Sequence, residues 1–265
     1  MRTKFLRIGS EAIHYLHTGK TTLPDTPPPL DRGAAIVFVS GEGGSAAMWG
    51  AQLAHFGRDH SPVAIDLPAH GRSTRLDAPA TVAEAVDVLV SVLVGLRAPP
   101  AVLVGHGYGG HVALAAAVAE PGRVRAVVTI GTSPVGRFPE DHRTKLELVV
   151  KGRLGQQFDT PYFGASPDMN AMRTYFMELA KTDPKVRLDD IAAYAGSDLG
   201  GSLERLSVPV LVVHGSDDRM CPCATADELA RAIPGARSAT IAGAGHVAHI
   251  EKPDDVNRAI ESVLA

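Results

Sequence analysis

This sequence contains few cysteines and carries a small net charge. Its 265 residues include only two cysteines, Cys221 and Cys223, which are separated by a single proline. That spacing is too short for an easy disulfide and lacks the further ligands of a zinc site. We therefore expect free thiols, no metal, and a reducing, cytoplasmic location. The formal net charge of -3 leaves no basic surface for nucleic acid or for an anionic membrane.

Long apolar runs are also missing. Arg7 and His14 interrupt the N-terminal segment and remove the apolar centre that a secretion signal needs. The most apolar helical stretch, residues 82–96, contains Glu84 and Asp87 and is shorter than the roughly 18 to 20 residues of a bilayer span. We expect no membrane contact and a small-molecule substrate as the partner, and a homodimer stays an open alternative.

Short runs rich in valine and isoleucine alternate with helical patterns along most of the chain, of which 45% is hydrophobic. The expected strands are residues 4–8, 12–19, 35–40, 62–66, 101–105, 125–131, 208–215 and 236–243. The expected helices between and after them are residues 46–58, 81–97, 108–119, 224–233 and 253–264. This alternation is typical of an α/β fold with a mostly parallel, doubly wound sheet, here of about eight strands.

The alternation stops between residues 134 and 206, where helical patterns such as "MNAMRTYFMELAKT" occur without a convincing strand. We predict a core domain formed by residues 1–133 and 207–265. Residues 134–206 are predicted to form a helical cap on it.

A glycine-rich turn follows the strand predicted at residues 101–105, and two interpretations compete for it. Gly105, Gly107 and Gly110 spell G-x-G-x-x-G, the fingerprint of a dinucleotide-binding turn. That turn normally lies in the first βαβ unit, with an acidic residue at the end of the next strand. Here the glycines come late, and the next strand ends in "VVTIGTS" without an acidic residue. The dinucleotide interpretation is therefore disfavoured, and no cofactor is expected.

The same turn, "GHGYGG", also matches a G-x-S-x-G turn except that glycine stands where the serine would be. Four other segments support this second interpretation. They are "VFVSGEGGSAAMW" (37–49), "DLPAHGRS" (66–73), "VPVLVVHGSDD" (208–218) and "IAGAGHVAHIEKPDDVNRAI" (241–260). In this order the segments resemble the α/β-hydrolase family, which includes esterases, haloperoxidase-like proteins and epoxide hydrolases. The resemblance implies the α/β-hydrolase fold over nearly the whole chain.

The resemblance also implies roles for single residues. Asp218 matches the acid and His246 the base of a catalytic triad, in the family's chain order. Gly107 matches the nucleophile but has no hydroxyl, which excludes the family's acyl-enzyme route. The backbone amides of Glu42 and Tyr108 match the oxyanion hole.

The segment around Glu42 departs from the family's pattern. Ser40 stands where the family usually has a histidine, and Glu42 is the residue whose amide belongs to the oxyanion hole. A charged Glu42 side chain inside the cavity would repel a developing oxyanion, whereas a protonated one could donate a proton. A Glu42 side chain in solvent would have no chemical role.

The predicted cap is rich in aromatic residues and methionine. We expect a substrate to be contacted by Ser40, Gly41, His106, Tyr108, Ser133, Tyr162, Phe163, Met172, Phe176 and Val247. The cap side chains could instead form the core of the cap itself. Either use favours a small apolar or aromatic substrate. Arg137 and Arg143 could meet a substrate carboxylate, although solvated surface charges are the simpler interpretation.

Three functions remain open. The first is a cofactor-independent enzyme in which His246 and Asp218 act as a general base without covalent catalysis, as a lyase, isomerase, cyclase or by direct attack of water. The second is an esterase-like serine hydrolase that is inactivated by a serine-to-glycine change at position 107. The third is a binding protein that keeps the pocket without the reaction. The intact acid and base weigh against the third, and Ser40 and Glu42 are unusual for a standard esterase, which weighs against the second. The first is therefore favoured.

Overall fold

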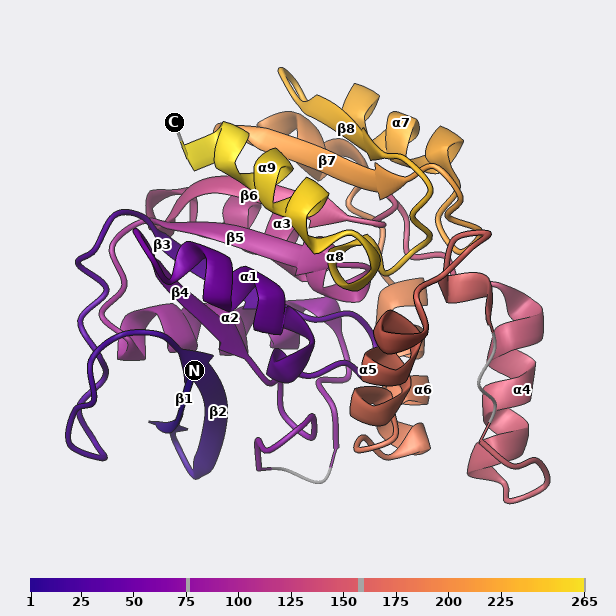
Figure 1. Cartoon of the computed structure of the whole chain (residues 1–265), viewed down its shortest axis with the longest axis horizontal. Coiled ribbons are helices and arrows are strands. Elements are labelled where there is room, and N and C mark those ends of the chain that lie inside the picture. Colours follow the sequence, from indigo (N-terminus) through magenta and orange to yellow (C-terminus); the bar gives the residue numbers. More distant parts are fainter. Residues whose placement is uncertain (75–76, 157–159, 265) are drawn as a thin grey trace.

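The structure is a computed structural model that describes residues 1–74, 77–156 and 160–264. A twisted sheet crosses the molecule, and helices cover both of its faces (Figure 1). The described strands are β1 (Arg2–Ile8), β2 (Glu11–His17), β3 (Ala35–Val39), β4 (Ser61–Ile65), β5 (Ala101–His106), β6 (Val124–Ile130), β7 (Val210–Gly215) and β8 (Arg237–Ile241). They form one 8-stranded sheet in the order β1-β2-β4-β3-β5-β6-β7-β8.

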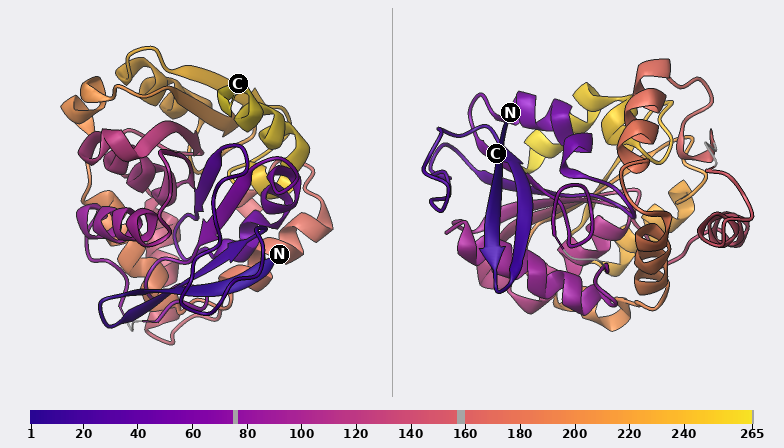
Figure 2. Two further views of the ribbon diagram at one scale, coloured as in Figure 1. Left: turned by 90° about the vertical axis from the view of Figure 1, so that its left-hand side faces the viewer. Right: turned by 90° about the horizontal axis from the view of Figure 1, so that it is seen from below.

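The strand directions confirm the predicted fold class. β1 and β2 pair antiparallel with each other, and β2 pairs antiparallel with β4. All later neighbours are parallel. Figure 2 shows the β1–β2 hairpin at one edge of the molecule. This is the mostly parallel α/β-hydrolase sheet that the sequence predicted.

The helices outside the predicted cap follow the sheet strands. They are α1 (Gly50–Phe56), α2 (Val82–Gly95), α3 (Tyr108–Ala119), α7 (Cys223–Ala232), α8 (Ala248–Glu251) and α9 (Pro253–Leu264), with short 3₁₀ turns η1 (Ala46–Trp49) and η2 (Pro121–Arg123). The helix predicted at residues 46–58 is thus divided into η1 and α1. Within the described residues, no helix combines the length and apolar character that crossing a bilayer requires.

Between β6 and β7 lies the segment of residues 134–206, called the cap segment below. It contains α4 (Glu140–Val150), η3 (Thr160–Tyr162), α5 (Met169–Leu179), α6 (Pro184–Ala195) and η4 (Gly200–Arg205). Its main helices lie beyond the arrowheads of β5 and β7 (Figure 1). An isolated bridge between Val135 and Asp198 joins the two ends of this segment. Its division from the rest as a separate domain stays a prediction.

Helix α6 begins before the helical pattern "LDDIAAYAGS", which spans residues 188–197 of the sequence. The Asp183 side chain accepts a hydrogen bond from the Lys185 amide, and Pro184 occupies the first helical position. The aspartate accepts a hydrogen bond from an amide that has no partner within the helix, and the proline has no amide hydrogen at all. Both therefore favour a helix start. The local capping residues therefore extend the helix beyond its apolar pattern.

Alternation along the central strands divides the core between the two faces of the sheet. Val37 and Val39 pack with Leu103 in one buried cluster. Ile36 and Phe38 pack into a second cluster on the other face. Because neighbouring strand residues point to opposite faces, the continuous apolar runs of the sequence fill both layers.

The glycines after β5 allow α3 to pack directly against the sheet. A Cβ atom on Gly109 would lie 2.4 Å from the carbonyl oxygens of Val39 and Ser40. A Cβ atom on Gly110 would lie 2.1 Å from the Thr132 Oγ1 atom. These two positions therefore require glycine for the close packing of α3 against the sheet.

We expect Gly109→Ala to destabilise the protein. The new methyl group meets two backbone carbonyls that cannot move independently, and overpacking of this kind costs about 1–3 kcal/mol. The measurement is urea unfolding followed by circular dichroism. Gly122→Ala is the matched control, because no atom lies within 4 Å of its added Cβ, and its effect should stay below about 1 kcal/mol. Equal stability of the two variants would contradict this account of the turn.

Candidate active site

Gly107 is the single residue between β5 and α3, and its backbone holds a sharp turn. Its φ of 49° and ψ of -117° lie in a region that L side chains rarely adopt. A residue with a side chain would be strained there by about 1–3 kcal/mol, whereas glycine is not. A Cβ atom at this position would lie 3.5 Å from His246 Nε2 and 3.4 Å from Glu42 Oε2. Position 107 therefore faces both groups.

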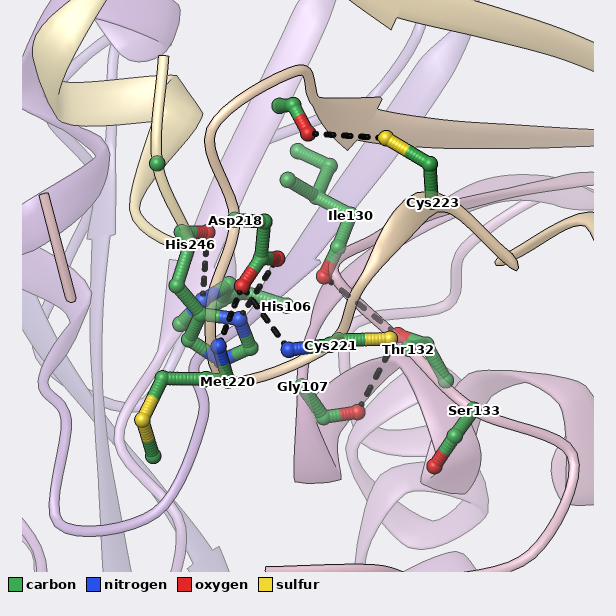
Figure 3. A network of polar contacts seen from close by, with 12 residues as sticks. His106, Gly107, Ile130, Thr132, Ser133, Asp218, Met220, Cys221, Cys223 and His246 are labelled. Carbon is green, nitrogen blue, oxygen red and sulfur yellow. Dashed lines mark hydrogen bonds and ion pairs between the residues drawn. The ribbon is translucent and has the colours of Figure 1, made fainter. Parts of the chain in front are cut away.

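His246 and Asp218 form a buried pair behind this turn (Figure 3). Asp218 follows β7 and His246 follows β8, so the carboxyl ends of adjacent strands bring them together. Asp218 Oδ2 lies 2.9 Å from His246 Nδ1. Asp218 Oδ1 accepts hydrogen bonds of 2.8 Å from the amides of Met220 and Cys221. The anchored carboxylate fixes the imidazole with Nε2 toward Gly107.

The surroundings of His246 raise its pKa. Burial alone lowers it, but the charge and hydrogen bond of Asp218 outweigh burial, and the charges of Glu42 and Glu251 add to the increase. The carboxylates of Asp218, Glu42 and Glu251 thus stabilise the imidazolium form of His246. This makes His246 a stronger base than an isolated imidazole.

The Glu42 side chain lies in the cavity, and the alternative that it faces solvent is wrong. Only 5% of Glu42 is exposed, and it lines the same cavity as Gly107 and His246. Its loop is held from the cap segment, because the amide of Gly43 donates a 2.8 Å hydrogen bond to Asp190 Oδ2 on α6. The same Oδ2 atom lies 2.6 Å from His70 Nε2. The buried pair of Asp190 and His70 thus holds the loop on which Glu42 lies.

The cavity above Gly107 is about 270 Å³ in volume. Its walls are formed by Glu42, Gly107, Gly131, Ser133, Arg137, Phe138, Tyr194, Met220, Cys221 and His246. Of the residues expected at the site, Glu42, Gly107, Ser133 and His246 meet here. Among the described residues, no group of three or more His, Cys, Asp or Glu side chains could hold a metal ion.

Ser40 and Gly41, which were both expected to contact substrate, lie in the loop after β3. Ser40 uses its hydroxyl to donate to the Ser45 carbonyl at 2.9 Å and to accept from Trp49 Nε1 at 3.0 Å. Gly41 lies against the His106 ring, where an added Cβ would approach Nδ1 to 2.6 Å. The Ser40 hydroxyl is thus engaged within its own loop. The Gly41 Cα atom lies 3.9 Å from the position of a Cβ on Gly107, so a substrate contact at Gly41 stays a prediction.

The side chains of His106 and Tyr108 are not among the walls of the cavity above Gly107. His106 Nε2 lies 3.2 Å from the His246 carbonyl oxygen, and its ring centroid lies 4.6 Å from that of His246. The Tyr108 side chain is fully buried in the main core. The Tyr108 amide is the first of α3, and the first amides of a helix have no intrahelical partner. The oxyanion-hole role of the Tyr108 and Glu42 amides stays a prediction.

The aromatic set of the cap segment mainly packs on itself, which was the alternative to substrate contact. Tyr162, Phe163 and Val247 belong to one buried cluster, and Met172 and Phe176 pack against it. Tyr162 still approaches the site, because its ring centroid lies 6.1 Å from that of His246.

Two residues that support the His246 loop were missed by the sequence analysis. A Cβ atom on Gly131, at the end of β6, would lie 2.8 Å from His246 Nδ1. The Glu251 carboxylate accepts 2.9 Å hydrogen bonds from the amides of Gly164 and Gly245. A glycine directly after a buried strand was the available signal for the first, and the motif "HIEKP" contained the second.

We expect the Cε1 proton of His246 to titrate in NMR with a midpoint above the ordinary value of 6.5. Because Asp218 supplies the largest increase, Asp218→Asn should move this midpoint to lower pH. His249 is an internal control, since burial and the nearby His246 charge lower its pKa to about 3. It should not titrate in the same range. An unchanged His246 midpoint in the variant would contradict the assigned role of Asp218.

The comparisons agree with this geometry. A family model described as "Alpha/beta hydrolase family" matches residues 36–259. The chain is 27% identical over 216 residues to a pimeloyl-(acyl-carrier protein) methyl ester esterase of Stenotrophomonas maltophilia, covering 76% of this chain and 81% of that protein. It is 24% identical over 238 residues to 3-oxoadipate enol-lactonase 2 of Acinetobacter baylyi, covering 87% and 88%.

Solved structures with the same fold are also similar. An esterase of Thermogutta terrifontis, in a malate-bound structure, superposes with a TM-score of 0.84 at 22% identity, covering 100% of this chain and 98% of that one. A bromoperoxidase of Bacillus anthracis superposes with a TM-score of 0.83 at 21% identity, covering 99% of each chain. At these identities the likeness concerns the fold alone.

Proposed function

Because this chain belongs to the alpha/beta hydrolase family, we propose that it is a cofactor-independent enzyme that works without a covalent nucleophile. His246, oriented by Asp218, is the general base. Glu42 is the second proton-transfer group. The substrate is a small molecule with an apolar or aromatic part.

One observation carries this proposal. His246 Nε2 and Glu42 Oε2 lie 3.5 Å and 3.4 Å from the point where a side chain of residue 107 would begin. In a serine hydrolase the nucleophile would stand at that point. Here a base and a carboxylate flank it, and Gly107 contributes no reactive atom. Two such groups around one small space are suited to moving a proton on a substrate or on water.

Each group has a separate task in this mechanism. Asp218 keeps the His246 ring in one orientation and stabilises the imidazolium that forms. His246 takes a proton at Nε2. Glu42 holds or returns a proton on the other side of the same space, and the Tyr108 amide at the start of α3 favours negative charge that develops there. General acid–base catalysis of this kind contributes about 10²–10⁴-fold in rate.

The names of the relatives favour hydrolysis among the reactions that this arrangement allows. Both are named for ester or lactone hydrolysis. In the direct route, a water proton passes to His246 Nε2 as the water oxygen bonds to the carbonyl carbon, and Glu42 in its protonated form donates a hydrogen bond to the carbonyl oxygen that gains negative charge. The carbon–oxygen bond to the leaving group then breaks, and the leaving alcohol takes the proton from the imidazolium. A lyase, isomerase or cyclase would use the same groups on a substrate proton instead.

Restoring a serine should separate this proposal from an inactivated esterase. We expect Gly107→Ser alone to stay within about tenfold of background on p-nitrophenyl acetate, because the Glu42 carboxylate opposes the oxyanion beside the new side chain. The double variant Gly107→Ser with Glu42→Ala should be faster by about 10²-fold. The measurement is the rate of p-nitrophenolate release, and fluorophosphonate labelling checks whether the new serine is nucleophilic. High activity of the single variant would instead indicate an ordinary esterase that has lost its serine.

The general base is tested by turnover itself. Aryl esters, lactones and β-hydroxy acids are incubated without added cofactor, and products are followed by proton NMR. For any compound turned over, His246→Gln should lower the rate by about 10³-fold or more, and Glu42→Gln by about 10²-fold. His55→Gln is the control, because His55 pairs with Glu261 on the surface. Binding without turnover across the panel, or unchanged rates in His246→Gln, would refute the enzyme proposal.

A further inference from the structure

A second cavity, of about 440 Å³, lies within the cap segment. We call it the cap cavity, and its described walls include Phe138, Leu146, Tyr162, Phe176 and Arg187. Phe138 lines both this cavity and the one above Gly107. The two cavities are therefore adjacent at Phe138.

Arg187 joins the cap cavity to the catalytic loops. Its side-chain stem lies against the loop that carries Glu42, since a Cβ atom on Gly43 would be 3.1 Å from Arg187 Cγ. Its guanidinium donates a hydrogen bond to the Tyr162 hydroxyl and lies 5.5 Å from the centre of that ring. The Tyr162 ring is in turn next to the His246 ring. A group bound at Arg187 would thus be one aromatic ring away from the proposed base.

The charge of Arg187 is incompletely matched. A guanidinium stays protonated in proteins, and in the part of the chain that the structure describes Arg187 forms no ion pair. Its Nε atom is buried without a hydrogen-bond partner in the same part of the chain. The charge of Glu42 acts on Arg187 from outside ion-pair distance. An unpaired donor of this kind is costly in an apolar site and is suited to an anionic ligand.

The other described walls are consistent with an anion beside an aromatic or apolar group. Lys145 is the other permanently cationic residue among the described residues of the cavity wall. Phe138, Phe176 and Leu146 supply the apolar surface. A planar guanidinium binds a carboxylate through two parallel hydrogen bonds, which a neutral amide cannot reproduce.

We propose that the cap cavity binds a carboxylate group of the substrate at Arg187, so that the substrate class is a small aromatic or alicyclic carboxylate. This rests on the proposed function, because it places the reacting end of the same molecule above Gly107. Of the two arginines that the sequence suggested for a carboxylate, Arg137 lines the cavity above Gly107, and its contact stays a prediction. Arg143 is instead paired with Glu140 and Glu147 on the surface of α4.

The test compares acids with their amides. Phenylacetate and 3-phenylpropionate, and the corresponding primary amides, are titrated into the full chain by calorimetry at neutral pH. Wild type should bind the acids about tenfold or more tightly than the amides. Arg187→Met should remove this preference while changing amide affinity by less than about threefold. Arg187→Lys should retain part of it, because the charge remains and the paired geometry is lost.

Arg143→Met is the matched control and should bind like wild type. His246→Gln should keep the acid preference, so that a failure of catalysis and a failure of carboxylate binding are observed separately. Equal weakening of acid and amide in Arg187→Met would show that Arg187 only supports the cap segment or balances Glu42. That result, or a wild type that binds neither acid or binds acids no better than amides, would overturn the proposal.

Discussion

The hydrogen bond between His246 and Asp218 depends on the ends of three adjacent strands. Asp218 follows β7, His246 follows β8, and Gly131 at the end of β6 leaves space for both side chains. Only 5% of each partner is exposed, so the pair is removed from competing water. Its geometry is maintained by the parallel pairing of the strands rather than by the loops alone, because a parallel sheet brings successive carboxyl ends to one edge.

Position 107 determines which chemistry that pair can perform. The backbone turn that would strain a serine is accommodated by glycine, and the Glu42 carboxylate approaches the same point from the loop after β3. A hydroxyl nucleophile and an inward-facing carboxylate are in electrostatic conflict when an oxyanion forms beside them. With glycine at position 107, the proposed chemistry avoids this conflict when Glu42 holds a proton and donates it toward the developing negative charge. The two departures from the family's pattern therefore support one another.

The cap segment influences the site through Asp190 and Arg187, both on α6. Asp190 fixes the loop that carries Glu42, through the Gly43 amide and the His70 ring. Arg187 packs on the same loop and contacts Tyr162 beside His246. One helix thus positions a proposed catalytic group and forms the wall of the cavity proposed for the substrate. The position of α6 affects catalytic geometry and specificity together.

The sequence by itself determined the fold class and the positions of the strands along the chain, and its resemblance to the α/β-hydrolase family implied that Asp218 and His246 are partners. The strands follow from local signals, since short apolar runs define them, and the two partners follow from motifs that match the family. The direction of Glu42, the role of Gly131 and the position of Arg187 were decided only by the tertiary structure. Each depends on contacts between distant segments, such as the hydrogen bond from Gly43 to Asp190. Neither periodicity nor spacing reports such contacts, because they arise only when the chain is folded and the side chains compete for the same buried space.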